Sequence, residues 1–402
     1  MKTLLKILKF ILISIVSLIL IFYATVFLGH KVFFKPEYSE VVTLPTIKNN
    51  EYCFGIECQE KISNAEDYIS VLADQIKRYN QNSLKFWPEN HVNNYYAIVE
   101  SIETNKAWLI HPNGKTEILS SDRVKEMTKN RPRYSVGFSK FEYQDMKGLY
   151  LALSENDLKN VLQFEKYYHL GTYDIFITYA HELFHMIEQE QWKSPDKVIN
   201  ASRNDRFEDV EARAQRNLIF QQVLKAVSEN DSIKKELLVK DVVSSYRKYQ
   251  NSYNEDYKNS IFLDRTEGTA YYFEMISSLY SAYPNQIKSE TDLYKGLQLI
   301  AKNTNTFDGI GLGIEGYWLS GWTGVLLDQL EKENKNSWKN KIMNDPQLTP
   351  LQILLDKYKD QEIPTPLNYN LEDANKIKEW INDDEKQSTM PALFQFLYQI
   401  VY

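Results

Sequence analysis

The chain of 402 residues has few cysteines, few histidines and no cluster of positive charge, and each scarcity excludes a class of function. Two cysteines are too few for a disulfide-stapled scaffold or for a zinc finger built on cysteines. The 47 Lys and Arg residues are scattered and the formal net charge is -7, so nucleic acid is not an expected partner. Any histidine-based site must be built from the six histidines, which are His30, His91, His111, His169, His181 and His185.

The sequence also lacks internal repeats and low-complexity segments. Hydrophobic residues make up 43% of it and charged residues 25%, which is ordinary for a globular protein and excludes a mainly disordered one. Its length allows two or three domains with sizeable buried cores.

One long hydrophobic run is present, and it lies at the N-terminus. Lys2, Lys6 and Lys9 precede an uncharged apolar stretch from Phe10 to Leu28. As a helix this stretch reaches about 28 Å, close to the hydrocarbon thickness of a bilayer. We therefore predict a transmembrane signal anchor over residues 1–31, with the N-terminus in the cytoplasm because the lysines flank that side.

The rest of the chain is then predicted to lie outside the cytoplasm, in the periplasm or at the cell surface, attached to the membrane by the N-terminal helix. The segment after the apolar run offers only a poor cleavage site, after Gly29. Cleavage there is the alternative, and it would make the protein secreted.

Residues 32–59 are predicted to form a juxtamembrane linker, because Pro36 and Pro45 interrupt a segment with little periodicity. Cys53 and Cys58 lie within it. A local disulfide between them is expected in an oxidising compartment, since a metal site would need further cysteines that the chain does not have.

The remaining sequence predicts an α+β fold in two parts. Residues 60–170 form the first part: an amphipathic helix over 60–81 precedes a β-meander, because β-branched and aromatic runs near 95–119 alternate with Asn/Gly turns. A further strand is expected over Gly148–Ser154. The second part, residues 171–402, is mostly helical. Its clearest predicted helices are 172–192, 206–228, 232–257, 263–281, 317–333 and 391–400.

The motif that carries chemistry is His181-Glu182-Leu183-Phe184-His185, within the predicted helix 172–192. Residues four apart share one face of a helix, so both imidazoles can reach one metal ion. Glu182 is offset by one residue, which lets its carboxylate meet a metal-bound water without ligating the metal. This pattern is typical of a catalytic zinc site with a glutamate general base.

A catalytic zinc ion has a third protein ligand and an open position for water. Every other histidine precedes His181, so a downstream third ligand must be a carboxylate. Two segments compete for this role: one contains Glu208 and Glu211, and the other contains Glu267.

The first of these segments has another interpretation. Glu208 and Glu211 lie near Arg206, Arg213 and Arg216 on one predicted helix. Opposite charges at helical spacing are typical of a solvated face with ion pairs, which would leave both glutamates away from the metal.

With Glu267 as the ligand, the sequence resembles the gluzincin metallopeptidases, whose zinc site combines a His-Glu-x-x-His helix with a glutamate from a later helix. In their aminopeptidase branch this glutamate begins a segment Glu-Gly-x-Ala-x-Tyr-x-Glu, matched here over Glu267–Glu274. The chain is also similar to bacterial predicted zinc peptidases with His-Glu-Leu-Phe-His followed by Glu-Gly-x-Ala. The resemblance implies a zincin-like catalytic region whose Zn2+ is bound by His181, His185 and Glu267. It also implies Glu182 as the general base.

Two further carboxylates are candidates for orienting a ligand histidine. Glu274 lies two helical turns after Glu267 on a similar face, and Asp174 precedes the first ligand histidine on the same predicted helix. The glycine after Glu267 would also let a neighbouring helix approach the site closely.

A tyrosine that stabilises the oxyanion is expected by analogy with other zinc peptidases. The glycine-rich run over 309–316 is not a phosphate loop, because no Gly-Lys-Ser/Thr follows it. It opens onto Tyr317, which is the candidate for this role. Tyr271 and Tyr272 are the alternatives.

The sequence therefore predicts a membrane-anchored, extracytoplasmic zinc metallopeptidase that acts on a peptide or protein substrate. The strand Gly148–Ser154 is expected at a sheet edge, where it would pair with an extended peptide. The aminopeptidase segment Gly-x-Met-Glu-Asn is absent, so exopeptidase specificity is not predicted. Two alternatives remain: a catalytically inactive, peptidase-like module that binds or senses zinc, and a zinc hydrolase of a non-peptide amide.

Overall fold

The computed structural model describes most of the chain between Ile47 and Ser388. The described residues are 47–55, 58, 65–88, 93–101, 106–129, 137–153, 174–193, 209–309, 314–331 and 334–388. The predicted anchor and the predicted helix 391–400 lie outside them. Within these ranges no helix combines the length and the apolar character needed to cross a membrane.

Contacts divide the chain into two compact units. One unit comprises Met1–Val42 with Trp380–Tyr402, and the other is Thr43–Glu379. The second unit contains the sheet, all but the last of the described helices, and every candidate site residue. Its fold is α+β, with a small mixed sheet followed by a mostly helical region, as the sequence predicts.

The sheet has five strands in the order β5-β4-β3-β7-β6. The predicted meander is present, because β3, β4 and β5 pair antiparallel in sequence order. The elements of this part are α2 (Ala65–Asn82), β3 (Tyr96–Ser101), β4 (Lys106–Ile110), β5 (Thr116–Leu119), α3 (Ser121–Met127), β6 (Gly137–Tyr143) and β7 (Met146–Leu153).

The strand predicted over 148–154 corresponds to β7, but its predicted place at a sheet edge is wrong. It pairs parallel with β3 on one side and antiparallel with β6 on the other. The backbone groups on both sides of β7 therefore pair within the sheet, and among the described strands the edge on this side is β6. A short turn joins β6 and β7 into a hairpin, so β6 covers the side of β7 that would otherwise be an edge.

Alternate positions of the strands face two hydrophobic cores. On one face, Val99 and Leu151 join a core with Leu72 from α2. On the other face, Ile98 packs in a smaller core with Val124 from α3. Helices therefore cover both faces of the sheet.

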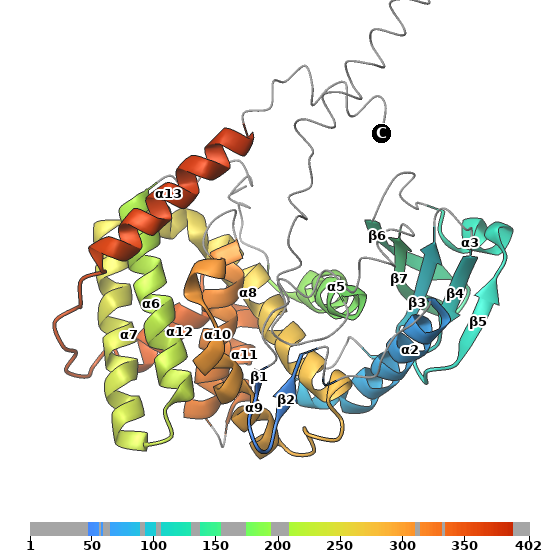
Figure 1. The fold of residues 1–402 in the computed structure, drawn as a ribbon, viewed down its shortest axis with the longest axis horizontal. Helices are drawn as coiled ribbons and strands as arrows, with labels where there is room; N and C mark the ends of the chain where they lie inside the picture. The colour runs from blue at the N-terminus through green and yellow to red at the C-terminus, as the bar shows by residue number, and fades with distance from the viewer. Residues whose placement is uncertain are drawn as a thin grey trace, which may run out of the picture. The chain divides into compact units, whose positions relative to one another are not determined.

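The helical region is built around α8, which packs against α10, α2 and α5. In Figure 1, α5 lies between the sheet and the other helices, and contacts with β7 and α8 place it there. The helices are α5 (Asp174–Leu183), α6 (Val210–Ser228), α7 (Ser232–Ser252), α8 (Asn254–Ala282), α9 (Glu290–Asn303), α10 (Ile314–Leu330), α11 (Asn336–Asn344), α12 (Pro350–Lys357) and α13 (Leu371–Ser388).

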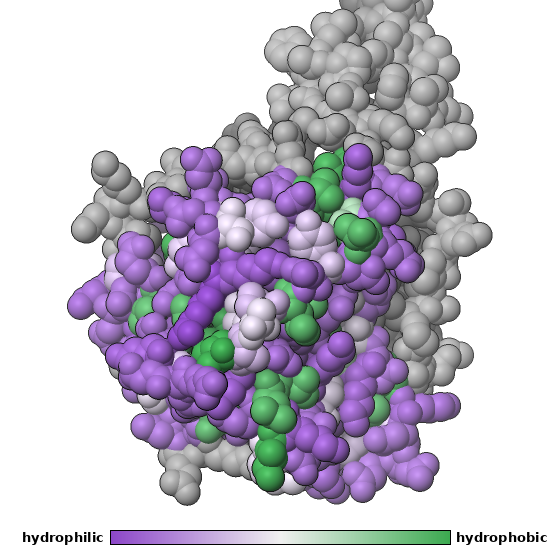
Figure 2. Space-filling view, turned by 90° about the vertical axis from the view of Figure 1, so that its left-hand side faces the viewer, coloured by the Kyte–Doolittle hydropathy of each residue, from purple (hydrophilic) through white to green (hydrophobic). Residues whose placement is uncertain are grey.

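Helices α6 and α7 begin where the sequence provides caps. The side chains of Asp209 and Asp231 accept hydrogen bonds from the first free backbone N–H groups of the two helices. The face of the molecule seen in Figure 2 is mostly hydrophilic, with separate apolar patches. Ile233 and Leu237 of α7 are among the exposed apolar side chains.

Glycines allow α8 and α10 to approach closely. A Cβ on Gly268 would lie 2.3 Å from Cβ of Ser320, and one on Gly321 would lie 2.5 Å from the ring of Tyr271. The close approach predicted for the glycine after Glu267 is therefore present, and α10 is the helix that approaches.

Part of the segment predicted as a linker folds onto the helical region. Strands β1 (Ile47–Lys48) and β2 (Cys53–Phe54) form a hairpin, and the disulfide between Cys53 and Cys58 is present as predicted. The side chain of Gln286 accepts a hydrogen bond from Cys53 N at 2.6 Å and donates one to Cys53 O at 2.9 Å. The hairpin is thus docked at the corner between α8 and α9.

Replacing Gly268 by alanine is expected to destabilise the protein, because the new methyl group collides with Ser320. Overpacking of this kind costs about 1–3 kcal/mol, which exceeds the gain of about 1 kcal/mol from alanine's helix propensity. Urea unfolding of Gly268→Ala should show the loss. In a Ser320→Gly background the same substitution should cost clearly less, and an equal cost in both backgrounds would contradict the close contact.

Candidate metal centre

Helix α5 and the π-helical turn that continues it carry the two histidines of the motif. Ile175, Phe176, Tyr179 and Phe184 are buried in the main core, and this packing fixes the helix between the sheet and α8. His181 and His185 therefore face α8. The α-helix ends at Leu183 and continues as a π-helical turn over Phe184–Glu188.

Helix α8 presents two glutamates to these histidines. Glu267 and Glu274 lie seven residues apart, which is two helical turns, so both face the same side of α8. Glu267 contacts Nε2 of both histidines, and Glu274 contacts Nδ1 of His181.

Three atoms converge at the centre of this arrangement. His181 Nε2 and His185 Nε2 are 3.0 Å apart, and Oε2 of Glu267 lies 3.3 Å and 3.1 Å from them. Ligand atoms around a tetrahedral zinc ion lie roughly 3.3 Å from one another, given metal–ligand distances near 2.0–2.1 Å. The spacing of these atoms therefore suits a zinc ion without rearrangement.

The hydrogen-bond partners of the two Nδ1 atoms show which ring nitrogens carry hydrogens, and hence the charge that the converging atoms need. His181 Nδ1 lies 3.0 Å from Oε2 of Glu274, and His185 Nδ1 lies 2.8 Å from Oε1 of Gln189. Both partners are hydrogen-bond acceptors, so each Nδ1 carries a hydrogen. In neutral imidazoles each Nε2 then presents a lone pair. Two such lone pairs and a carboxylate oxygen repel one another unless a cation lies among them.

This donor set fits a divalent metal ion. The three side chains of His181, His185 and Glu267 are only 10%, 22% and 17% exposed, so water screens the charges weakly. Two imidazoles and one carboxylate form a ligand set found in catalytic zinc sites. Among the described residues, these three side chains form the group that can hold a metal ion.

Without a metal, a proton supplies the missing positive charge. Burial lowers the pKa of His181, but hydrogen bonds with Glu267 and Glu274 outweigh it and raise the pKa to about 10. Burial raises the pKa of Glu267, but hydrogen bonds with His181 and His185 outweigh it and hold the pKa well below its usual range. The metal-free group is therefore a protonated His181 beside an ionised Glu267.

The hydrogen bond proposed between Glu274 and a ligand histidine is present, and Glu274 is buried. The side chain of Asp174, the other candidate, lies outside the described part of the chain. Glu208 lies outside it too. Glu211 is exposed at the start of α6 and accepts a hydrogen bond of 3.5 Å from the hydroxyl of Tyr253. Of the competing glutamates that the structure describes, Glu211 and Glu267, it is Glu267 that meets the histidines.

The remaining predicted residues border this group. Tyr317, in the first turns of α10, stacks on the ring of His181 with centroids 5.7 Å apart and planes 9° from parallel. Glu182 follows His181 on α5 and is half-buried. The hydroxyl of the alternative Tyr272 is buried and donates to Asp328 instead.

A buried ionic network that the sequence did not predict lies at the start of α10. Arg213 and Arg216 of α6 form ion pairs with Glu315 of α10 and with Asp256 and Asp264 of α8. Both arginines are buried, so they are not part of a solvated face, whereas Glu211 of the same helix is exposed, as the alternative interpretation of that glutamate predicts. Because Glu315 is two residues before the tyrosine that stacks on the metal group, the network fixes the turn that carries it.

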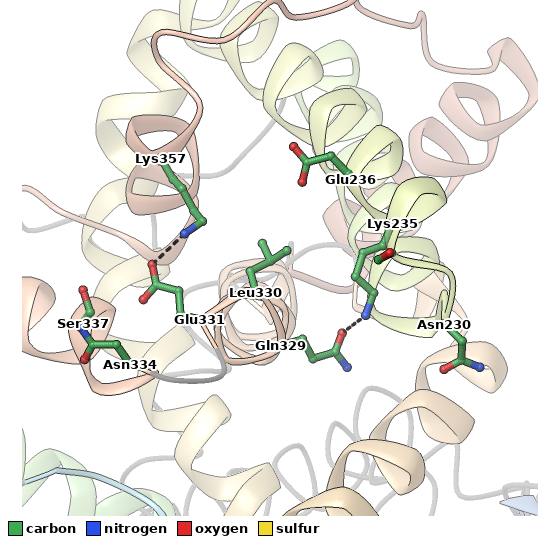
Figure 3. Close-up of a pocket in the computed structure, with 10 residues that line it drawn as sticks. Asn230, Lys235, Glu236, Gln329, Leu330, Glu331, Asn334, Ser337 and Lys357 are labelled. Carbon is green, nitrogen blue, oxygen red and sulfur yellow. Dashed lines mark hydrogen bonds and ion pairs between the residues drawn. The ribbon is translucent and has the colours of Figure 1, made fainter.

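A separate cavity of about 680 Å³ lies among the ends of α7, α10, α11 and α12 (Figure 3). Its charged side chains are occupied by the protein itself: Lys357 lies 3.4 Å from Glu331, and Lys235 donates to Gln329 at 2.6 Å. None of its lining residues belongs to the candidate metal group. This cavity is therefore not part of the candidate centre.

Comparison with known proteins finds no match for this chain among family models, curated proteins or solved structures. The geometry of the His-His-Glu group is therefore what any functional inference depends on.

Removing a ligand should abolish tight metal binding. Elemental analysis of the purified full chain is expected to find about one bound metal ion per molecule, and His185→Ala or Glu267→Ala should weaken binding on the order of 100-fold or more. Glu211→Ala is the matched control and should keep the metal. Loss of the metal from the control, with retention in Glu267→Ala, would contradict the assignment of the third ligand.

Zinc affinity should rise with pH well above the range of an ordinary histidine. The folded pKa of His181 is about 10 and the unfolded one near 6.5, so in the metal-free chain its proton is lost only as the pH approaches 10. Zinc must displace this proton, which gives roughly tenfold tighter binding per pH unit between pH 7 and 9. Titration against a competing chelator measures this, and constant affinity over that range would contradict the raised pKa.

Proposed function

We propose that the chain is a zinc-dependent peptide hydrolase. The observation that carries the proposal is the convergence of three potential metal-binding atoms, one from α8 and two from the helical segment that also carries Glu182. A zinc ion bound there would polarise a carbonyl group and lower the pKa of a water molecule towards about 7. Three protein ligands leave the open position that catalysis needs, whereas a structural zinc site has four.

Glu182 is the residue proposed to move the proton. It follows His181 on α5 and does not belong to the three-residue group of potential ligands. It would accept a proton from the attacking water and deliver it to the leaving amine.

Tyr317 is proposed to stabilise the negative charge that develops on the carbonyl oxygen. Its support is the stacking of its ring on His181 and the ionic network that fixes Glu315 nearby. A tyrosine held in this way needs no rearrangement when the charge develops.

An extended peptide is the proposed substrate. Strand β6 is the edge strand among those the structure describes, and a peptide can add to a sheet edge through main-chain hydrogen bonds. Lys140 of β6 lies 3.3 Å from Glu190, which follows the π-helical turn of the metal helix. The edge and the metal helix are thus linked directly.

The proposal includes a membrane anchor over residues 1–31 and a catalytic region outside the cytoplasm. The apolar stretch Phe10–Leu28 and its flanking lysines support the anchor. The disulfide between Cys53 and Cys58 is the kind of bond that persists in an oxidising compartment.

Glu182→Gln should abolish peptide hydrolysis while leaving zinc in place. Loss of a general base costs about 100- to 10,000-fold in rate, and the amide has nearly the shape of the carboxylate. Cleavage of a peptide library by parent and variant, beside their zinc content, measures both effects. Full activity in the variant would overturn the role of Glu182, and a zinc-loaded parent that cleaves no peptide would favour a binding module.

A further inference from the structure

The turn after His185 departs from a regular helix, and this departure places one more side chain on the metal group. The backbone N–H of Gln189 donates to the carbonyl of Phe184, five residues earlier, which is the pattern of a π-helical turn. Such turns are rare and are frequent at functional sites. Here the wide turn directs Gln189 back towards the ring of His185.

The side-chain amide of Gln189 has three partners. Its Oε1 lies 2.8 Å from His185 Nδ1, and its Nε2 donates to Thr266 O at 2.7 Å and to Thr269 Oγ1 at 2.9 Å. A carbonyl oxygen only accepts hydrogen bonds, so the amide nitrogen must face Thr266. The oxygen must then face His185, and this fixes which ring nitrogen carries the hydrogen.

The two threonines tie this contact to the third ligand. Thr266 and Thr269 flank Glu267 on the same turn of α8, and the hydroxyl of Thr269 donates to Arg265 O at 2.7 Å. One side chain therefore joins the ring of His185 to the turn that presents Glu267.

The two histidines have different hydrogen-bond partners at Nδ1. His181 has the buried carboxylate of Glu274, whereas His185 has a neutral amide. Glu267, Glu274 and the proposed general base Glu182 already place three carboxylates around the metal position. A fourth carboxylate, at position 189, would add negative charge and weaken the metal's pull on electrons.

We propose that Gln189 is a positioning residue that holds His185 in the metal-binding tautomer and couples it to Glu267 without adding negative charge to the site. This inference rests on the proposed function, because it concerns the same metal. It adds a residue that acts through His185 rather than on the substrate.

The test compares Gln189→Leu with Gln191→Leu in the full chain. Gln191 is a matched control, since it lies two residues further along the same short helical turn and, among the described residues, its side-chain amide donates to the carbonyl of Ile187 at 3.1 Å. Zinc affinity, measured with a chromophoric chelator, should fall 10- to 100-fold in Gln189→Leu, and zinc should dissociate faster. Both quantities should stay at the parent's values in the control. Equal affinity in parent and Gln189→Leu, or equal losses in both variants, would overturn the proposal.

Gln189→Glu separates positioning from charge. This variant should bind zinc at least as tightly as the parent, because the carboxylate still accepts from Nδ1. The acidic limb of its kcat/KM profile should move to higher pH, which a merely structural role would not cause. An unchanged profile would overturn the charge part of the inference.

Nuclear magnetic resonance of the zinc-loaded parent, with labelled histidine, tests the tautomer without any variant. A hydrogen on His185 Nδ1 is expected, and zinc bound at Nδ1 would overturn the proposal. A parent that binds no zinc would overturn the proposed function and this inference together. A parent with zinc and an indifferent Gln189→Leu would overturn the inference alone.

Discussion

Three electron pairs that face one another across about 3 Å are the constraint on which the rest of the site depends. His181 and His185 direct their outer nitrogens, and Glu267 an oxygen, at one point in a largely buried space. Such a group is stable only around a cation. The hydrogen-bond acceptors at the two Nδ1 atoms keep the hydrogens there, so neither ring can relieve the repulsion by a change of tautomer. The fold therefore favours a positive charge at this point.

The surrounding helices are arranged so that this point does not shift. Gly268 lets α10 lie against α8 beside Glu267, and the glutamate at 315 fixes the first turn of α10 on two buried arginines. Breaking one partner of a buried ion pair costs about 3–5 kcal/mol, so this turn has little freedom. Tyr317 consequently meets the ring of His181 as part of a rigid framework.

Local patterns allowed the ligands, the meander and most long helices to be predicted. The spacing of His181 and His185 is a property of one helix, and the segment after Glu267 is a short continuous match. Pairings between distant segments could not be predicted this way. The parallel pairing of β7 with β3 and the burial of Arg213 and Arg216 depend on partners far along the chain. Gln189 had a local signal, since it lies four residues after a ligand, but its role depends on a turn that periodicity does not reveal.

The docked hairpin also determines how mechanical load enters the folded unit. The first described residues of this unit, from Ile47 to Cys58, are held by backbone pairing, by the disulfide from Cys53 to Cys58, and by the amide of Gln286. Tension applied to the chain at Ile47 would therefore be borne first by this hairpin and by the corner between α8 and α9. The turn of α8 that carries Glu267 would be spared until the hairpin detaches.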